Sequence, residues 1–204
     1  MSLPASGPKQ DRSRVTHDRL LEATVDSLAE SGWARTTVAT VAGRAGVSRG
    51  AAQHHFPTRD DLVTAAIEHM SEARLAEIRA AMETVPDGHG RVRLALDHLV
   101  RLYTGPLFTA ALHVWTEAAV DDALRARIIP LEQRLAREAY QLAVTLLRVD
   151  GDDPAVRSAL AATLDLARGL GLADVLTDDA ARRSRVLDMW AEQLSEALRI
   201  RSGR

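Results

Sequence analysis

The sequence predicts an all-α protein, with a small N-terminal domain followed by a larger helical domain. Apolar residues recur at spacings of three and four along most of its 204 residues, as they do on the buried face of an α-helix. No stretch shows the alternation that is typical of a strand, and no internal repeat appears. Prolines and glycines instead divide the chain into segments of helix length.

Residues 1–13 are expected to form a flexible arm, because their prolines and glycine oppose regular structure. Lys9 and Arg12 can steer this arm toward DNA phosphates or into a minor groove, and a solvated tail explains them equally well. A first helix is expected over residues 16–31, ending at Gly32.

Residues 36–56 are the most informative segment, because they read as two short helices joined by a tight turn. Val41 and Ala42 supply the apolar side of the first short helix. Gly46 follows, where a left-handed residue commonly ends a helix. Ser48 can cap the second short helix by accepting a hydrogen bond from a free backbone N–H. The second helix is left with polar side chains on an outward face, which suits the major groove of DNA.

This arrangement resembles the DNA-binding domain of the TetR family of transcriptional regulators. The resemblance covers roughly residues 14–70 and consists of five segments in the family's order and spacing. These segments are Leu20-Leu21-Glu22-Ala23 through Ser31-Gly32-Trp33, Thr36-Thr37-Val38, Ala45-Gly46-Val47-Ser48, His54-His55-Phe56 and Arg59-Asp60-Asp61-Leu62. The chain departs from the family at Gln53, where an aromatic residue is usual, so the family's contact at this position does not carry over.

Six residues are expected to bind DNA: Thr37, Ser48, Arg49, Gln53, His54 and Arg59. Arg49 is the expected base reader, because a guanidinium fits guanine O6 and N7, and Gln53 suits adenine. His54 and Arg59 are assigned to backbone phosphates. Thr37 is expected to cap the first short helix and also to meet a phosphate.

The adjacent histidines of the second short helix do not predict a metal site. Side chains of neighbouring helical residues point about 100° apart, so His54 and His55 cannot easily share an ion. His55 is expected to pack beneath the helix and Phe56 to lie in the core. His113 and Glu117 lie one turn apart but lack a third ligand at a readable spacing. No metal and no cofactor is therefore expected.

Thr58 is the expected N-cap of a long helix over residues 59–82 that touches both domains. After a break at Pro86-Asp87-Gly88, five helical pieces are expected, at about 89–104, 106–119, 121–149, 154–174 and 179–201. Pro130 should kink or divide the third piece, and Asp153 and Pro154 should start the fourth. The expected organisation is an arm (1–13), a helix-turn-helix domain (14–58) and an effector-binding and dimerisation domain (59–204).

The resemblance implies that the last two helices pair with the same helices of a second copy. Two stripes are the candidates for this interface, although either can equally be intramolecular core: Leu160, Leu164, Ala167 and Gly171, and then Val186, Met189, Trp190, Gln193, Leu194 and Ala197. The resemblance also motivates a set of effector-pocket candidates: Tyr103, Phe108, Leu112, His113, Trp115, Thr116, Asp165 and Arg168. Asp165 and Arg168 read either as a buried ion pair or as the polar end of a ligand cavity.

Composition excludes several classes of protein. The chain has no cysteine, which excludes disulfides, thiol catalysis and cysteine-ligated zinc. Its apolar runs stay short of the ~20 residues that cross a bilayer, and no apolar signal segment is evident. Cytoplasm is therefore the expected compartment. The net charge is −2, although residues 1–60 hold eight Lys and Arg against six Asp and Glu.

The expected function is a homodimeric transcriptional repressor that a small apolar effector releases from a roughly palindromic double-stranded operator. One alternative is an effector-independent or architectural DNA-binding protein, or an activator. An enzyme is not expected, because the sequence has no Gly-rich phosphate loop, nucleophile elbow or metalloprotease helix. A helical enzyme with a vestigial DNA-binding head is the most distant alternative, since only Asp165, Arg168 and His113 suggest a polar constellation.

Overall fold

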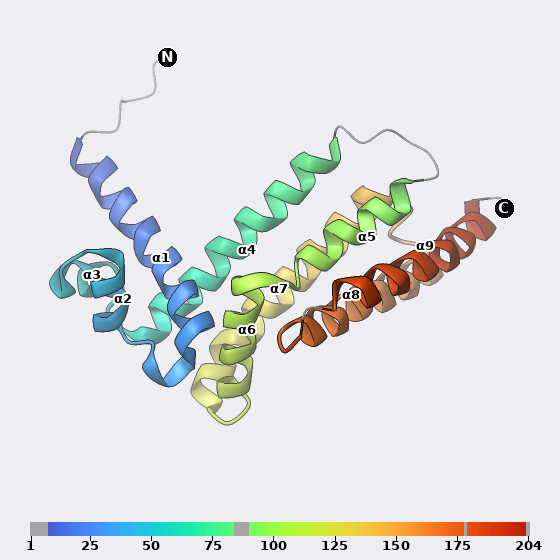
Figure 1. The fold of residues 1–204 in the computed structure, drawn as a ribbon. Coiled ribbons are helices and arrows are strands. Elements are labelled where there is room, and N and C mark those ends of the chain that lie inside the picture. The colour runs from blue at the N-terminus through green and yellow to red at the C-terminus, as the bar shows by residue number, and fades with distance from the viewer. Residues whose placement is uncertain (1–7, 84–89, 178, 203–204) are drawn as a thin grey trace, which may run out of the picture. The chain divides into compact units, whose positions relative to one another are not determined.

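The computed structural model describes residues 8–83, 90–177 and 179–202, and within them the chain forms nine α-helices and no strand (Figure 1). The helices are α1 (Pro8–Arg35), α2 (Val38–Ala45), α3 (Arg49–His55), α4 (Arg59–Glu83), α5 (Arg91–Arg101), α6 (Gly105–Ala118), α7 (Asp122–Leu147), α8 (Pro154–Asp174) and α9 (Ala180–Ser202). The all-α prediction is confirmed. The predicted break at Pro86-Asp87-Gly88 lies outside the described residues. None of the described helices combines the length and the apolar character that crossing a membrane requires.

The first helix begins earlier than the sequence predicted. Residues 8–13 are helical, so the prediction of a flexible arm is wrong for them, and residues 1–7 lie outside the described residues. Proline suits a first helical position, because its fixed φ matches the helix and its missing N–H needs no partner there. Gly32 interrupts α1 with a φ of 72°, where the sequence predicted a helix end.

Contacts within the chain define two compact units. One consists of Met1–Met70 with Thr109–Leu131, and the other of Ser71–Phe108 with Glu132–Arg204. These units cut across the predicted domains, because α4, α6 and α7 each contribute residues to both. The predicted division at residues 58 and 59 stays a prediction.

The core of the first unit joins α1, α2, α3 and the start of α4. Leu20, Leu28, Val41 and Leu62 are fully buried there. The loop between α1 and α2 is tied down by the Thr36 hydroxyl, which contacts the Ser27 hydroxyl at 3.0 Å and donates to the Gly32 carbonyl at 2.9 Å. Buried hydroxyl groups therefore fix how the chain enters α2.

In the second unit, α8 and α9 lie side by side and pack on α5 (Figure 1). The Arg91 Nε donates to the Leu146 carbonyl at 2.9 Å and so ties α5 to α7. The Asp153 side chain accepts from the Ala155 N–H at 2.8 Å, which confirms the predicted start of α8.

Pro130 does not divide α7, which runs from Asp122 to Leu147 without interruption. The proline is exposed, so its ring takes no place in the core. The lost hydrogen bond and the clash of the ring with the preceding turn are local costs, and the helix continues for several turns on both sides of them.

Candidate nucleic-acid interface

Helices α2 and α3 are capped and joined by residues that the sequence singled out. The Thr37 hydroxyl accepts from the Thr40 N–H at 3.1 Å, and the Thr37 N–H donates to the Thr40 hydroxyl at 2.8 Å, which makes a capping box. Gly46 ends α2 with a φ of 67°, in the left-handed region. The Ser48 hydroxyl then accepts from the Ala51 N–H at 3.2 Å and caps α3.

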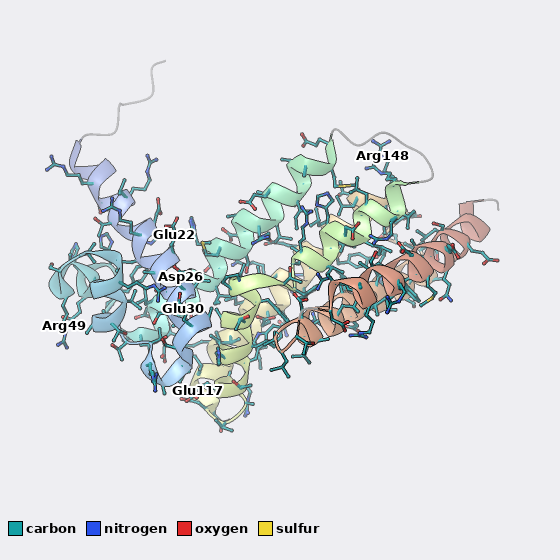
Figure 2. The ribbon with its side chains drawn as sticks, in the orientation of Figure 1. Glu22, Asp26, Glu30, Arg49, Glu117 and Arg148 are labelled. Atoms are coloured by element: carbon teal, nitrogen blue, oxygen red, sulfur yellow. The ribbon has the colours of Figure 1, made fainter. Side chains whose placement is uncertain are left out.

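Helix α3 has one buried and one exposed face. Ala52 and Phe56 are buried against the rest of the first unit, together with Ala42 of α2, whose small size permits the two helices to cross closely. Arg49, Gln53 and His54 are exposed on α3, as the sequence predicted. Figure 2 shows the Arg49 side chain extending from α3 into solvent. Helix α3 therefore presents the Arg49 guanidinium, the Gln53 amide and the His54 imidazole to solvent.

The other three predicted DNA-binding residues, Thr37, Ser48 and Arg59, already have partners within the chain. The hydroxyl and the N–H of exposed Thr37 are both used in the capping box. The Arg59 guanidinium lies over the Trp33 ring, 4.1 Å from the ring centroid, with Nε 3.8 Å from an Asp60 carboxylate oxygen. This stacking holds Arg59 at the start of α4, where its side chain is 36% exposed and so can still reach a phosphate.

An ion pair holds α2 against α1. The Arg44 guanidinium donates to the Glu30 carboxylate at 2.7 Å and lies 3.8 Å from Asp26. The three acidic residues Glu22, Asp26 and Glu30 follow one another along α1 (Figure 2). The hydrogen bonds from Arg44 lower the pKa of Glu30, so the pair stays ionised at neutral pH.

The ends of α6 and α7 complete the first unit. Arg127 of α7 donates to the Asp61 carboxylate at 2.5 Å, and the Thr58 hydroxyl donates to the same side chain at 2.6 Å. Thr58 also caps α4 as predicted, since its hydroxyl accepts from the Asp61 N–H at 3.1 Å. The His113 ring of α6 lies 3.5 Å from the place where a Cβ would stand on Gly32. These contacts set the start of α4, which carries Arg59.

The structure brings four of the predicted effector residues together in the second unit. The rings of Tyr103 and Phe108 are buried and meet edge to face, with centroids 5.8 Å apart. The Arg168 guanidinium lies 5.1 Å from the centroid of the Tyr103 ring and donates to Asp165 at 2.8 Å. Burial raises the pKa of Tyr103, and Arg168 opposes that shift. The Tyr103 hydroxyl therefore stays protonated at neutral pH.

The expectation of a buried Asp165–Arg168 pair is wrong. The Asp165 side chain is 74% exposed and that of Arg168 39% exposed. Asp165 lies on the outer face of α8, because the opposite face of this helix is taken up by the core. The remaining predicted effector residues lie on the part of α6 that belongs to the first unit: Leu112, His113, Trp115 and Thr116.

The first predicted dimer stripe is intramolecular core. Leu160, Leu164, Ala167 and Gly171 are all buried within their own chain, which favours the second of the two interpretations that the sequence left open. A Cβ on Gly171 would stand 1.8 Å from the Tyr103 carbonyl oxygen, which shows how closely α8 approaches the segment after α5.

The residues of the second predicted dimer stripe fall into a group that packs within the chain and a group that is exposed. Leu194 is buried, and Trp190 is half-buried and donates its indole N–H to the Thr163 hydroxyl at 3.0 Å, so these two pack inside the chain. Met189, Gln193 and Ala197 are exposed, and Val186 is half-buried beside them.

Sequence reasoning missed three exposed apolar residues at the end of α8: Leu172, Val175 and Leu176. No helical pattern singles them out, because Val175 and Leu176 follow the last residue of α8. It also missed His17, whose ring packs against His55 and Phe56. The predictions that His55 packs beneath α3 and that Phe56 is core are confirmed.

Comparison with known proteins identifies the same N-terminal segment. Residues 20–66 match the family model described as bacterial regulatory proteins of the tetR family. The chain is 30% identical over 191 residues to the HTH-type transcriptional regulator CymR of Pseudomonas putida, which covers 93% of this chain and 94% of that protein.

Solved structures show the same fold. A transcriptional regulator from Pseudomonas aeruginosa PAO1 superposes with a TM-score of 0.69 at 23% identity, covering 93% of this chain and 92% of that one. A member of the TetR family from Streptomyces coelicolor A3 superposes with a TM-score of 0.63 at 26% identity, covering 90% of this chain and 98% of that one.

Proposed function

The chain belongs to the TetR family of bacterial regulatory proteins and is a helix-turn-helix transcriptional regulator, and we propose that it is a homodimeric repressor released from its operator by a small molecule. Two copies of α3 enter successive major grooves of a roughly palindromic site, with centres about 34 Å apart. A small, mostly apolar effector binds the helical C-terminal region and reduces the affinity for DNA.

The observation that carries this proposal is the division of α3 into two faces. The buried face, with Ala52 and Phe56, packs against α1 and α2, while Arg49, Gln53 and His54 are exposed on the other face. A helix that is held rigidly and presents hydrogen-bonding groups outward matches the width of the major groove. Arg49 reads guanine and Gln53 reads adenine in this proposal, and His54, Thr37, Ser48 and Arg59 contact backbone phosphates.

The outer face of α8 and α9 supports a dimer. Met189 is 46% exposed and Leu172 is 55% exposed, and Gln193 and Ala197 continue the exposed face along α9. Large apolar side chains in an exposed row commonly mark an interface. A second copy covers them in the proposed dimer, and its two-fold axis relates the two recognition helices.

Helix α4 supports a coupling between effector and DNA, because it contributes residues to both compact units. Tyr103, Phe108, Asp165 and Arg168 are the proposed effector contacts that the structure gathers in one place. Leu112, His113, Trp115 and Thr116 remain separate effector candidates, because they belong to the other compact unit. A coupling free energy of ~1–3 kcal/mol between effector and operator suffices to change DNA affinity by one or two decades.

The experiment is fluorescence anisotropy of the purified protein on labelled duplexes from the DNA that flanks its own gene, with random DNA as competitor. Arg49→Ala should weaken binding to the preferred duplex by about 1–3 kcal/mol and relax its sequence preference. His54→Ala should weaken all sequences alike, because a phosphate contact carries no sequence information. Arg101→Ala, which removes an exposed arginine from α5, is the matched control and should change neither.

The outcomes separate the candidate functions. Binding without sequence preference, unaffected by any small molecule, would support an architectural protein. A protein that binds no DNA, even after selection from a random-sequence library, would overturn the proposal. Ligand-bound and free dimers with the same separation of recognition helices would contradict the coupling through α4.

A further inference from the structure

Three histidines gather where α1 meets the end of the recognition helix. The His17 ring of α1 lies 5.9 Å from the His55 ring and 5.1 Å from the Phe56 ring, measured between centroids. The His55 ring in turn lies 5.9 Å from His54 and 6.3 Å from Phe56. We call His17, His54, His55 and Phe56 the histidine cluster. All of its members belong to the first compact unit.

This cluster supports a helix that is too short to hold itself in place. Helix α3 has only seven residues, and isolated helices of that length are unstable in water. Its C-terminal end is fixed by buried Phe56, whose N–H donates to the Ala52 carbonyl at 2.8 Å. His17 covers the same end from the side of α1. The rings therefore hold the C-terminal end of α3 against α1, close to Gln53 and His54 of the proposed DNA-binding face.

The contact suits neutral imidazoles and opposes charged ones. Neutral aromatic rings attract one another edge to face, as His17 and His55 are arranged here. The pKa of His55 is lowered, chiefly by burial and then by the charges of His17 from α1 and His54 from its own helix. The carboxylate nearest to the cluster on α1 is Asp18, at 3.5 Å from the His17 Nδ1. A positive charge on His17 would face the His55 ring across this contact.

We propose that the histidine cluster is an acid-sensitive contact that orients the recognition helix, so that acidification loosens α3 and releases DNA. Unperturbed histidines take up protons below about pH 6.5, so the change falls within a physiological range. Because the native state disfavours protonated His55, the contact is fully stabilising above that pH and weakens as the pH falls. The release of DNA rests on the proposed function, whereas the loosening of α3 does not.

The first test measures amide hydrogen exchange in the free protein at pH 5.0 and pH 7.5, corrected for intrinsic rates. The reporters are the N–H groups of Ala52 and Phe56, which donate within α3 at 3.0 Å and 2.8 Å. Their opening should become about tenfold more frequent at the lower pH. This is the factor expected for two unit charges about 6 Å apart at an effective dielectric constant of about 40.

Three variants test whether His17 causes the response of α3 to acid. His17→Phe keeps an aromatic ring against Phe56 but cannot take up a proton, so the acid response of α3 should fall to less than about threefold. His17→Gln is a second uncharged variant, in case phenylalanine overpacks the contact. His69→Gln removes an exposed histidine of α4 in the same unit and should respond to acid like the wild type.

The second test is the affinity for a duplex obtained by selection from random sequence, measured at the same two pH values. The wild type should bind more weakly at pH 5.0, and His17→Phe should lose most of this dependence. Histidines that simply gain attraction to phosphates would instead tighten binding at low pH. That result, or an α3 whose opening does not change with pH, would overturn the proposal. A failure of DNA binding at both pH values would contradict the proposed function and leave the exchange test intact.

Discussion

Replacing Gly171 by alanine should destabilise the protein, although alanine is the better helix former. The Cβ of the new residue would stand 1.8 Å from the Tyr103 carbonyl oxygen, 2.8 Å from the carbonyl carbon and 2.9 Å from the Tyr103 Cβ. Ordinary contacts begin at 3.4 Å, so α8 and the end of α5 must separate by roughly 1.6 Å. The obstacle is backbone, which cannot rotate away as a side chain can.

The expected change in the free energy of unfolding follows from two opposing effects. Overpacking of a close-packed core typically costs about 1–3 kcal/mol, and a backbone clash belongs at the upper end of this range. The gain in helix propensity from glycine to alanine is about 1 kcal/mol. We therefore expect Gly171→Ala to lower the free energy of unfolding by about 2 kcal/mol.

Gly169→Ala provides the matched control on the same helix. A Cβ on Gly169 would meet no heavy atom within 4 Å, so only the gain of about 1 kcal/mol should appear. The two variants should thus differ by about 3 kcal/mol. Urea denaturation followed by circular dichroism measures this difference, at several protein concentrations because dimerisation contributes to apparent stability.

Two results would refute the reasoning. Equal stability of both variants would mean that α8 does not approach Tyr103 closely. A Gly171→Ala protein that loses only its concentration-dependent stability would show that Gly171 faces a second copy, as the sequence suggested, and that the assignment to the core is mistaken.

Three further predictions concern other contacts. Thr36→Val should lower the free energy of unfolding by about 1–3 kcal/mol in thermal denaturation, because it leaves the buried Ser27 hydroxyl without this partner; an unchanged midpoint would contradict it. Met189→Glu should shift the equilibrium measured by analytical sedimentation from dimer toward monomer. An unchanged dissociation constant of the dimer would show that this face of α9 is not part of the interface. Hydrogen bonds from the Thr58 hydroxyl and from Arg127 of α7 lower the pKa of Asp61. These two contacts therefore stabilise the folded protein above about pH 4, and this stabilisation is lost as the pH falls through the pKa of Asp61 in the folded state. Asp61→Asn should therefore reduce the dependence of the free energy of unfolding on pH in that window. If the variant and the wild type show the same dependence, the contacts of Asp61 contribute nothing to stability.

Local sequence patterns were enough to predict the features that depend on neighbouring residues. Thr37 and Ser48 cap their helices, Gly46 takes the left-handed turn between α2 and α3, and Asp153 starts α8, all as predicted. A cap or a turn is made by residues within a few positions of one another, so its signal is local and readable. The outward face of α3 followed from the same short-range pattern.

The partner that each apolar face packs against could not be predicted in this way and is known from the folded chain. The stripe that contains Leu160 and Gly171 has the same period whether it packs on its own chain or on a second copy, and the structure buries it within the chain. The same packing turned Asp165 outward and brought His17 to His55 across 38 positions of sequence. Helical periodicity specifies that a face is buried, but the identity of the neighbour depends on contacts between distant segments, which no local pattern encodes.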